Sequence, residues 1–165
     1  MDPENKIING AFDFWQRGTS FTTAAYGADR WINITSGSGT VTQSRQAFAV
    51  GNILGTNNPT YFLRQTVSGQ SGVGAYAFTI QRIEGVRSYA GQTITVLGWA
   101  RRSSGSGNMT VEGEQFFGTG GSPSTVVAAI SPTTVNLTDS FAPFAVVMTI
   151  PSITGKTLGT NGNDY

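Results

Sequence analysis

The segment Gln92–Arg101, QTITVLGWAR, constrains the fold of this chain more than any other. Its side chains alternate, so that Ile94 and Val96 point to one side of an extended strand and Trp99 and Arg101 point to the other. No window of about a dozen residues shows a period near 3.6, and β-branched residues with frequent glycine disfavour helix. The segment therefore predicts a β-strand with an aliphatic core face, in a chain without extensive helix.

Seven further segments have the composition of strands and are separated by turn signals rich in Gly, Ser, Asn and Pro. Short strands of this kind are typical of an antiparallel sandwich or barrel. We therefore expect one all-β domain over residues 1–165, built as an antiparallel two-sheet β-sandwich, with RRSSGSGN at 101–108 as a hairpin loop. The further expected strands are Asp29–Ile34, Thr40–Gln46, Tyr61–Val67, Ala75–Ile83, Met109–Phe117, Thr134–Thr138 and Pro143–Ile150.

The absence of two residue types excludes several kinds of chemistry. The sequence contains no Cys, which excludes disulfides and thiolate metal sites. It also contains no His, which excludes Ser-His-Asp triads, histidine-ligated zinc and acid–base catalysis by imidazole. A polysaccharide-degrading enzyme would need acidic residues that converge from different strands, and the nine carboxylates scattered along the chain barely supply them.

Charge is sparse and balanced along the chain. Lys plus Arg number 10 and Asp plus Glu number 9, so the net charge of +1 provides no strong field to attract nucleic acid or a membrane. No apolar run approaches the length of a membrane-spanning helix, about 18 residues. We expect no nucleic-acid partner and no membrane insertion. Charged residues make up only 12% of the chain, which favours a surface committed to neighbouring subunits or neutral polar ligands.

Five segments, read in order, resemble one protein family. They are INGAFDFWQRGTSF near the start, ADRW at 28–31, QRIEG at 81–85, AGQTITVLGWAR at 90–101, and FFGTGGSPS followed by PSITGKTLGTNGNDY. Together they are similar to a jelly-roll domain of tailed-phage virion proteins, found in tail fibres, receptor-binding proteins and head spikes. That family is in turn similar to galactose-binding-like carbohydrate-binding modules. In such proteins a further strand usually follows the position of Tyr165, so the resemblance implies that a closing strand could be missing at the C-terminus.

The resemblance implies a non-enzymatic structural protein on the surface of a phage particle. Its expected partners are host surface polysaccharide and other virion proteins, and a homo-oligomer is expected, with a trimer fitting spikes and fibres. The alternative is a capsid decoration, head-fibre or connector protein without a ligand. A polysaccharide-degrading enzyme is a third, weaker alternative. The sequence identifies neither the sugar nor the place in the virion.

The candidate contact residues follow from the strand pattern. Trp99 and Arg101 lie opposite the aliphatic face and would suit a glycan or a neighbouring subunit. Glu112 and Glu114 share one face of the following strand, roughly 7 Å apart. Paired carboxylates at such a separation can hydrolyse glycosides, but two residues on one strand do not easily flank a scissile bond, and they could simply offset nearby arginines. Three tyrosines in or beside loops are further glycan candidates: Tyr26, Tyr61 and Tyr89.

The aromatic start of the chain has two interpretations. Trp15 could be a stacking platform for a sugar, but we expect Phe12, Trp15 and Trp31 to fill the core together with Ile94 and Val96. Asp13 occupies a position at which the similar carbohydrate modules often hold a structural calcium ion. The resemblance therefore implies a speculative calcium site at Asp13 and no other cofactor.

Overall fold

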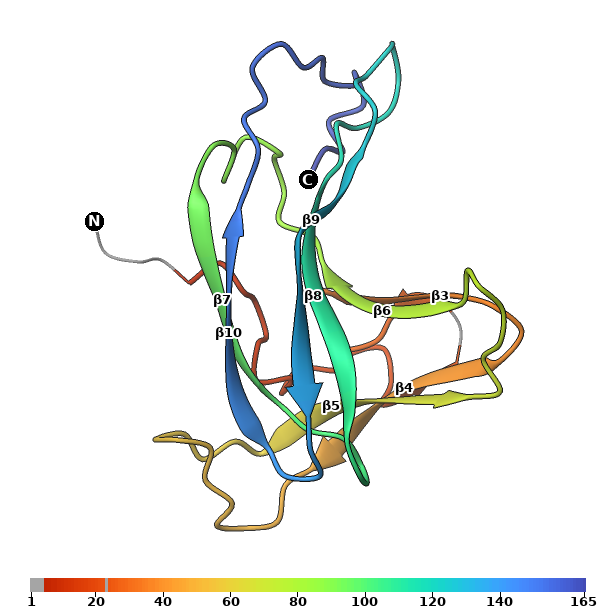
Figure 1. Ribbon diagram of the computed structural model, residues 1–165, viewed down its shortest axis with the longest axis vertical. Coiled ribbons are helices and arrows are strands. Elements are labelled where there is room, and N and C mark those ends of the chain that lie inside the picture. Colours follow the sequence, from red (N-terminus) through yellow and green to blue (C-terminus); the bar gives the residue numbers. More distant parts are fainter. Residues whose placement is uncertain (1–4, 23) are drawn as a thin grey trace. The chain divides into compact units, whose positions relative to one another are not determined.

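The computed structural model describes residues 5–22 and 24–165, and all regular secondary structure in these ranges is β-strand (Figure 1). Every pair of strands is antiparallel. The described residues include no helix that could span a membrane. The predicted all-β, antiparallel fold is therefore confirmed. The strands are β1 (Ser20–Phe21), β2 (Ala25–Tyr26), β3 (Trp31–Ser36), β4 (Thr40–Ala47), β5 (Tyr61–Ser68), β6 (Tyr76–Gln81), β7 (Thr93–Ala100), β8 (Gly107–Gln115), β9 (Val127–Leu137) and β10 (Ala142–Thr149).

The chain divides into two compact units. Unit 1 is Met1–Arg82 and unit 2 is Ile83–Tyr165. Each unit contains two sheets: β1-β4-β5 and β2-β3-β6 in unit 1, and β7-β10 and β8-β9 in unit 2. The organisation of residues 1–165 as one domain stays a prediction, and the two units are described separately.

A layer of polar side chains lies between the two sheets of unit 1. Gln43 on β4 and Gln65 on β5 each donate a hydrogen bond to Thr79 Oγ1 on β6, over 3.3 and 3.4 Å. Gln65 Nε2 also donates to Asn33 Oδ1 on β3, over 3.3 Å. Asn33 and Gln43 are completely buried. We call these four residues the amide layer; its hydrogen bonds connect one sheet of unit 1 to the other.

The amide layer is tightly packed, but two of its polar atoms lack a hydrogen-bond partner. Asn33 Nδ2 and Gln43 Oε1 are buried and form no hydrogen bond within the described residues. Gln43 Oε1 also lies so close to Gly27 that a Cβ atom there would overlap it. Gly27 is therefore required for close approach of the two sheets rather than for a special backbone conformation.

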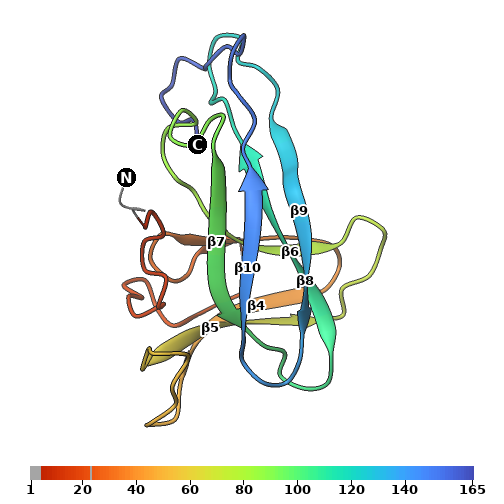
Figure 2. The same cartoon turned by 60° about the vertical axis from the view of Figure 1, so that its left-hand side comes forward.

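Unit 2 has an apolar interior instead. Ile130 on β9 and Val146 and Met148 on β10 are buried in one cluster, which Ile150 completes beyond the end of β10. Residues from all four strands of unit 2 pack against or belong to this cluster, so the β7-β10 and β8-β9 sheets meet face to face through it (Figures 1 and 2). Because the hydrophobic effect is non-directional, this interior holds the sheets together without specific polar pairs.

The connection between β7 and β8 differs from the prediction. Residues 101–108 were expected to form a hairpin loop, but β7 pairs with β10 and β8 pairs with β9. The loop therefore carries the chain from one sheet of unit 2 to the other. The Gly- and Ser-rich sequence that suits a hairpin also suits this crossing, because both need a flexible, polar connection.

The segment after β10 folds back onto the start of the β8–β9 connection. Tyr165 and Phe116 exchange two backbone hydrogen bonds, of 2.8 and 3.0 Å. Asp164 accepts hydrogen bonds from the backbone N–H groups of Gly85 and Val86. Two segments quoted for the resemblance, 116–124 and 151–165, thus lie together in one loop-built end of unit 2.

Candidate functional site

The outer face of the β7-β10 sheet carries several exposed apolar side chains. Along β7 the side chains alternate between the apolar interior and the outside, and Leu97 and Trp99 point outward with 73% and 37% of their surfaces exposed. Their cross-strand neighbours on β10 are Ala145 and Pro143, and Val147 on the same face is 60% exposed. We call these five residues the Trp99 face. It is the candidate functional site because single exposed apolar residues are ordinary whereas contiguous ones mark contact surfaces.

A glycine–aromatic pair supports the Trp99 face from the inside. Gly98 lies opposite Phe144 in the register of β7 and β10. A Cβ at Gly98 would lie only 2.6 Å from Phe144 Cζ, so the phenyl ring covers the glycine backbone. Phe144 itself packs against the apolar cluster. The backbone that carries Trp99 is thereby fixed from the core side, which leaves the indole directed outward.

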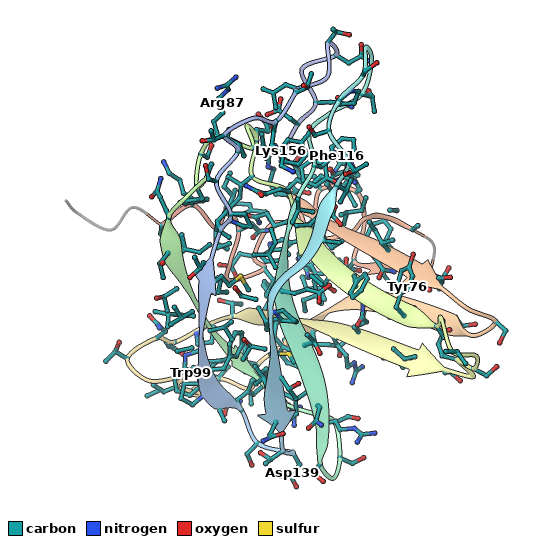
Figure 3. The ribbon with its side chains drawn as sticks, turned by 45° about the horizontal axis from the view of Figure 1, so that its top comes forward. Tyr76, Arg87, Trp99, Phe116, Asp139 and Lys156 are labelled. Carbon is teal, nitrogen blue, oxygen red and sulfur yellow. The ribbon has the colours of Figure 1, made fainter. Side chains whose placement is uncertain are left out.

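Arg101 is held at one end of the Trp99 face, just beyond β7. Its Nη1 donates a hydrogen bond of 3.2 Å to the backbone oxygen of Asp139. Its guanidinium carbon lies 5.1 Å from the centroid of the Phe141 ring, a cation–π distance. Trp99 and Asp139 are both located toward the same end of unit 2 (Figure 3). The structure therefore places the predicted Trp99 and Arg101 at one end of the same sheet.

Glu112 and Glu114 belong to a different surface. Both are exposed on β8, and the alternate residues Val111 and Gly113 face the apolar cluster. The carboxylates thus lie on the outer face of the β8-β9 sheet, and Trp99 lies on the outer face of the opposite sheet. Glu114 Oε1 accepts a hydrogen bond of 3.3 Å from the Tyr165 hydroxyl. The hairpin across which these carboxylates were expected to offset Arg101 and Arg102 is not formed, because β7 pairs with β10 and β8 pairs with β9.

The three candidate tyrosines do not converge on one site. Tyr26 is exposed on β2, with the Arg17 guanidinium 5.7 Å from its ring centroid. Tyr61 is half-buried at the start of β5, with Arg45 at 4.3 Å from its ring. Tyr89, in unit 2, packs against the apolar cluster. Each ring already has a contact within its own unit.

The predicted core residues occupy different depths. Trp15 is buried, and its ring lies 6.5 Å from that of Phe21. Phe12 and Trp31 are half-buried and pack on each other, with ring centroids 5.2 Å apart. The indole N–H groups of both tryptophans donate to backbone oxygens in the segment 9–12. The side chains of Ile94 and Val96 pack against the apolar cluster of unit 2.

Asp13 is exposed. The described ranges contain no group of three or more His, Cys, Asp and Glu side chains that could hold a metal ion.

The aliphatic part of the Trp99 face was missed by the sequence analysis. Val147 lies in the predicted strand Pro143–Ile150, but its outward orientation becomes informative only once β10 is paired with β7. Tyr76 (labelled in Figure 3) and Phe78 were also missed. Both are exposed on β6, and their rings stack with centroids 4.8 Å apart. In both cases alternation within the strand was the available signal.

Comparison of the chain with protein-family models, with curated proteins and with solved structures found no match.

Proposed function

We propose that this protein is a non-enzymatic structural component of a tailed-phage particle, of the tail-fibre or spike type, that contacts host surface polysaccharide through the Trp99 face. The phage context and the finer jelly-roll assignment rest on the sequence resemblance. The observation that supports binding is the exposed indole of Trp99 on the outer face of the β7-β10 sheet, with Arg101 two residues further along the chain hydrogen-bonded to the backbone oxygen of Asp139.

The chemistry of this face is compatible with a sugar. The C–H-rich face of a pyranose packs on an aromatic ring as other apolar groups do. Hydroxyl groups accompany the indole on the same side of the sheet, where Thr93 Oγ1 and Thr149 Oγ1 lie 3.4 Å apart. Arg101 adds a planar donor at the other end of the face. A shallow face of this kind favours weak binding to a repeating polymer, and an oligomer would raise avidity by roughly 10² to 10⁴.

A non-enzymatic role agrees with the placement of the carboxylates. Glu112 and Glu114 project from the exposed side of one strand, and Glu114 is engaged by the Tyr165 hydroxyl. Glycoside hydrolysis needs two carboxyl groups on either side of the scissile bond. A binding function does not require this arrangement.

One observation favours the second candidate function, a decoration or connector protein without a glycan ligand. Leu97 and Val147 are more exposed than Trp99 on the Trp99 face. Aliphatic side chains contribute little to sugar recognition but are well suited to burial against another virion subunit. In that case the whole Trp99 face would be covered by protein.

The test compares the truncation of two exposed aromatic residues, one on the Trp99 face and one outside it. Biotinylated full-length chain, displayed on streptavidin tetramers, is applied to an array of bacterial surface polysaccharides. Trp99→Ala is expected to weaken binding at least about tenfold, because it removes the stacking platform. The matched control, Tyr76→Ala, removes a similarly exposed aromatic side chain on β6 of unit 1, outside the Trp99 face, and is expected to retain binding. Absence of any signal with the wild-type tetramer would contradict glycan binding and favour the connector function.

A further inference from the structure

We propose that the free edge of β7 is a homotypic interface, at which β7 of a second copy of this chain pairs antiparallel to form a continuous four-stranded sheet. Each sheet of unit 2 has only two strands. Within the described residues, each of these strands therefore has one edge that is not hydrogen-bonded to another strand. Exposed edges are templates for pairing, and proteins usually protect them with charge, proline or bulges. The proposal rests on how differently these four edges are protected and does not depend on glycan binding.

The edges of β8 and β9 are protected. β8 carries Glu112 and Glu114, and its pairing with β9 contains two register shifts, between Val111 and Gly113 and between Gly113 and Gln115. β9 contains Pro132, which lacks an N–H donor. Its residues Ala129 and Ser131 have positive φ angles of 51° and 48°, which distort the strand further. Neither strand offers a regular edge to a partner.

The edge of β10 is also blocked. Pro143 removes one donor near the start of the strand. At the other end, the backbone N–H of Thr149 donates to Ser131 Oγ on β9, over 3.2 Å. The far end of β10 is therefore already engaged within unit 2.

β7 has none of these protections. Its eight residues, TITVLGWA, include no charged residue and no proline. Its register with β10 runs without a shift from Thr93 to Ala100, and β10 is the only described strand with which it pairs. A long, neutral edge with an unbroken register is expected to take up another strand.

The sequence of β7 is complementary to itself in one antiparallel register. A two-fold axis at Leu97 keeps the inner faces of both copies on the same side of the sheet, because residues directly opposite share a face. On the inner face, Ile94 would then lie opposite Ala100 of the second copy, and Val96 opposite Gly98. Each bulky side chain meets a small residue, which allows close packing.

The outer face and the charges fit the same register. Leu97 would lie opposite Leu97 of the second copy, so that the most exposed residue of the Trp99 face is covered by its own symmetry mate. Thr95 would lie opposite Trp99. The nearest charged residue, Arg101, would meet Thr93 and not another arginine, so the pairing brings no like charges together. The two Trp99 faces would form one surface.

The first test is sedimentation velocity of the full chain over a range of concentrations. The wild type is expected to form a reversible dimer. Leu97→Lys places two like charges directly opposite each other and is expected to weaken dimerisation by about tenfold or more. Val147→Lys is the matched control: it is on the same face and similarly exposed, but one strand away from the edge, and it is expected to change the dissociation constant by less than about threefold.

The second test uses the absence of native cysteine. Residues directly opposite in an antiparallel pair have Cα atoms about 4.5 to 5.5 Å apart, within the range of a disulfide. Leu97→Cys is therefore expected to give a disulfide-linked dimer on mild oxidation, much faster than the control Val147→Cys. Circular dichroism of each variant verifies folding, and Leu97→Glu, which also places two like charges opposite each other, replaces Leu97→Lys if that variant is unfolded.

Three results would overturn the proposal. The first is a wild-type chain that stays monomeric at the highest concentration reached. The second is equal weakening of the dimer by Leu97→Lys and Val147→Lys, which would indicate stacking of faces instead of pairing of edges. The third is cross-linking of Leu97→Cys no faster than Val147→Cys. Because the polysaccharide array uses a streptavidin scaffold to supply valency, its outcome is independent of these results.

Discussion

The two units of this chain join their sheets by opposite means. Between the sheets of unit 1 lies the amide layer, in which Asn33 and Gln43 are completely buried. Between the sheets of unit 2 lies an apolar cluster that includes Val146 and Met148. Antiparallel pairing is common to both units, so the comparison shows that pairing alone does not determine what fills the space between two sheets.

The difference has consequences for specificity and stability. An apolar interior gains free energy from burial in almost any arrangement of similar volume. An amide layer gains only when donors and acceptors meet, and a buried polar atom without a partner costs about 1–3 kcal/mol. Asn33 Nδ2 and Gln43 Oε1 are such atoms within the described residues. The amide layer therefore defines the register of unit 1 more strictly and contributes less net stability than the cluster of unit 2.

The largest expected effect on stability comes from placing an amide side chain, like those in the interior of unit 1, in the apolar interior of unit 2. Val146→Asn buries an amide among apolar side chains with no partner nearby, and we expect a loss of about 3 kcal/mol in the free energy of unfolding. Urea denaturation measures the loss, and hydrogen exchange read peptide by peptide shows whether residues 83–165 are affected. The control Val147→Asn changes the next, outward-facing residue and is expected to cost no more than about 0.5 kcal/mol. Equal losses for both would contradict the apolar interior.

A smaller loss is expected when the amide layer is broken at its centre. Gln65→Leu preserves the approximate shape but removes both bonds from Gln65 Nε2, and Asn33 Oδ1 then has no remaining hydrogen bond of those described. We expect a loss of about 2 kcal/mol. Thr66→Leu, at the neighbouring exposed position of β5, is the control for the introduced side chain. A neutral effect of Gln65→Leu in urea denaturation would show that the amide layer does not hold the sheets together.

The smallest effect is expected at Gln43. Gln43→Met removes one hydrogen bond of 3.3 Å to Thr79 but also removes the unpaired Oε1, and Gln65 still donates to Thr79. Because the lost bond and the relieved oxygen offset each other, the free energy of unfolding is expected to change by less than about 1 kcal/mol in either direction. A large loss in the free energy of unfolding, measured with urea in the same way, would mean that the buried, unpaired Gln43 Oε1 does not destabilise the fold.

Much of the fold could be predicted from local sequence, because strand alternation is a local property. The expected segments Thr40–Gln46 and Tyr61–Val67 correspond to β4 and β5 almost residue for residue. Strand partners could not be predicted in the same way. The turn signal at 101–108 favoured pairing of β7 with β8, yet the partner of β7 is β10, some forty residues later.

The outward orientation of Trp99 followed from alternation, since one strand determines which residues share a face. The extent of the Trp99 face did not, because Pro143, Ala145 and Val147 come from a distant strand. The amide layer could not be predicted from the sequence for a related reason. Asn33, Gln43 and Gln65 look like solvent-facing residues of three separate strands, and only the packing of two sheets shows that they face inward.

The amide layer also has a thermal consequence. Exposure of apolar surface on unfolding raises the heat capacity, whereas exposure of polar surface lowers it. Unfolding of unit 1 releases buried amides, and unfolding of unit 2 releases the aliphatic cluster. The stability of unit 1 should therefore vary less steeply with temperature, and cooling should weaken unit 2 first.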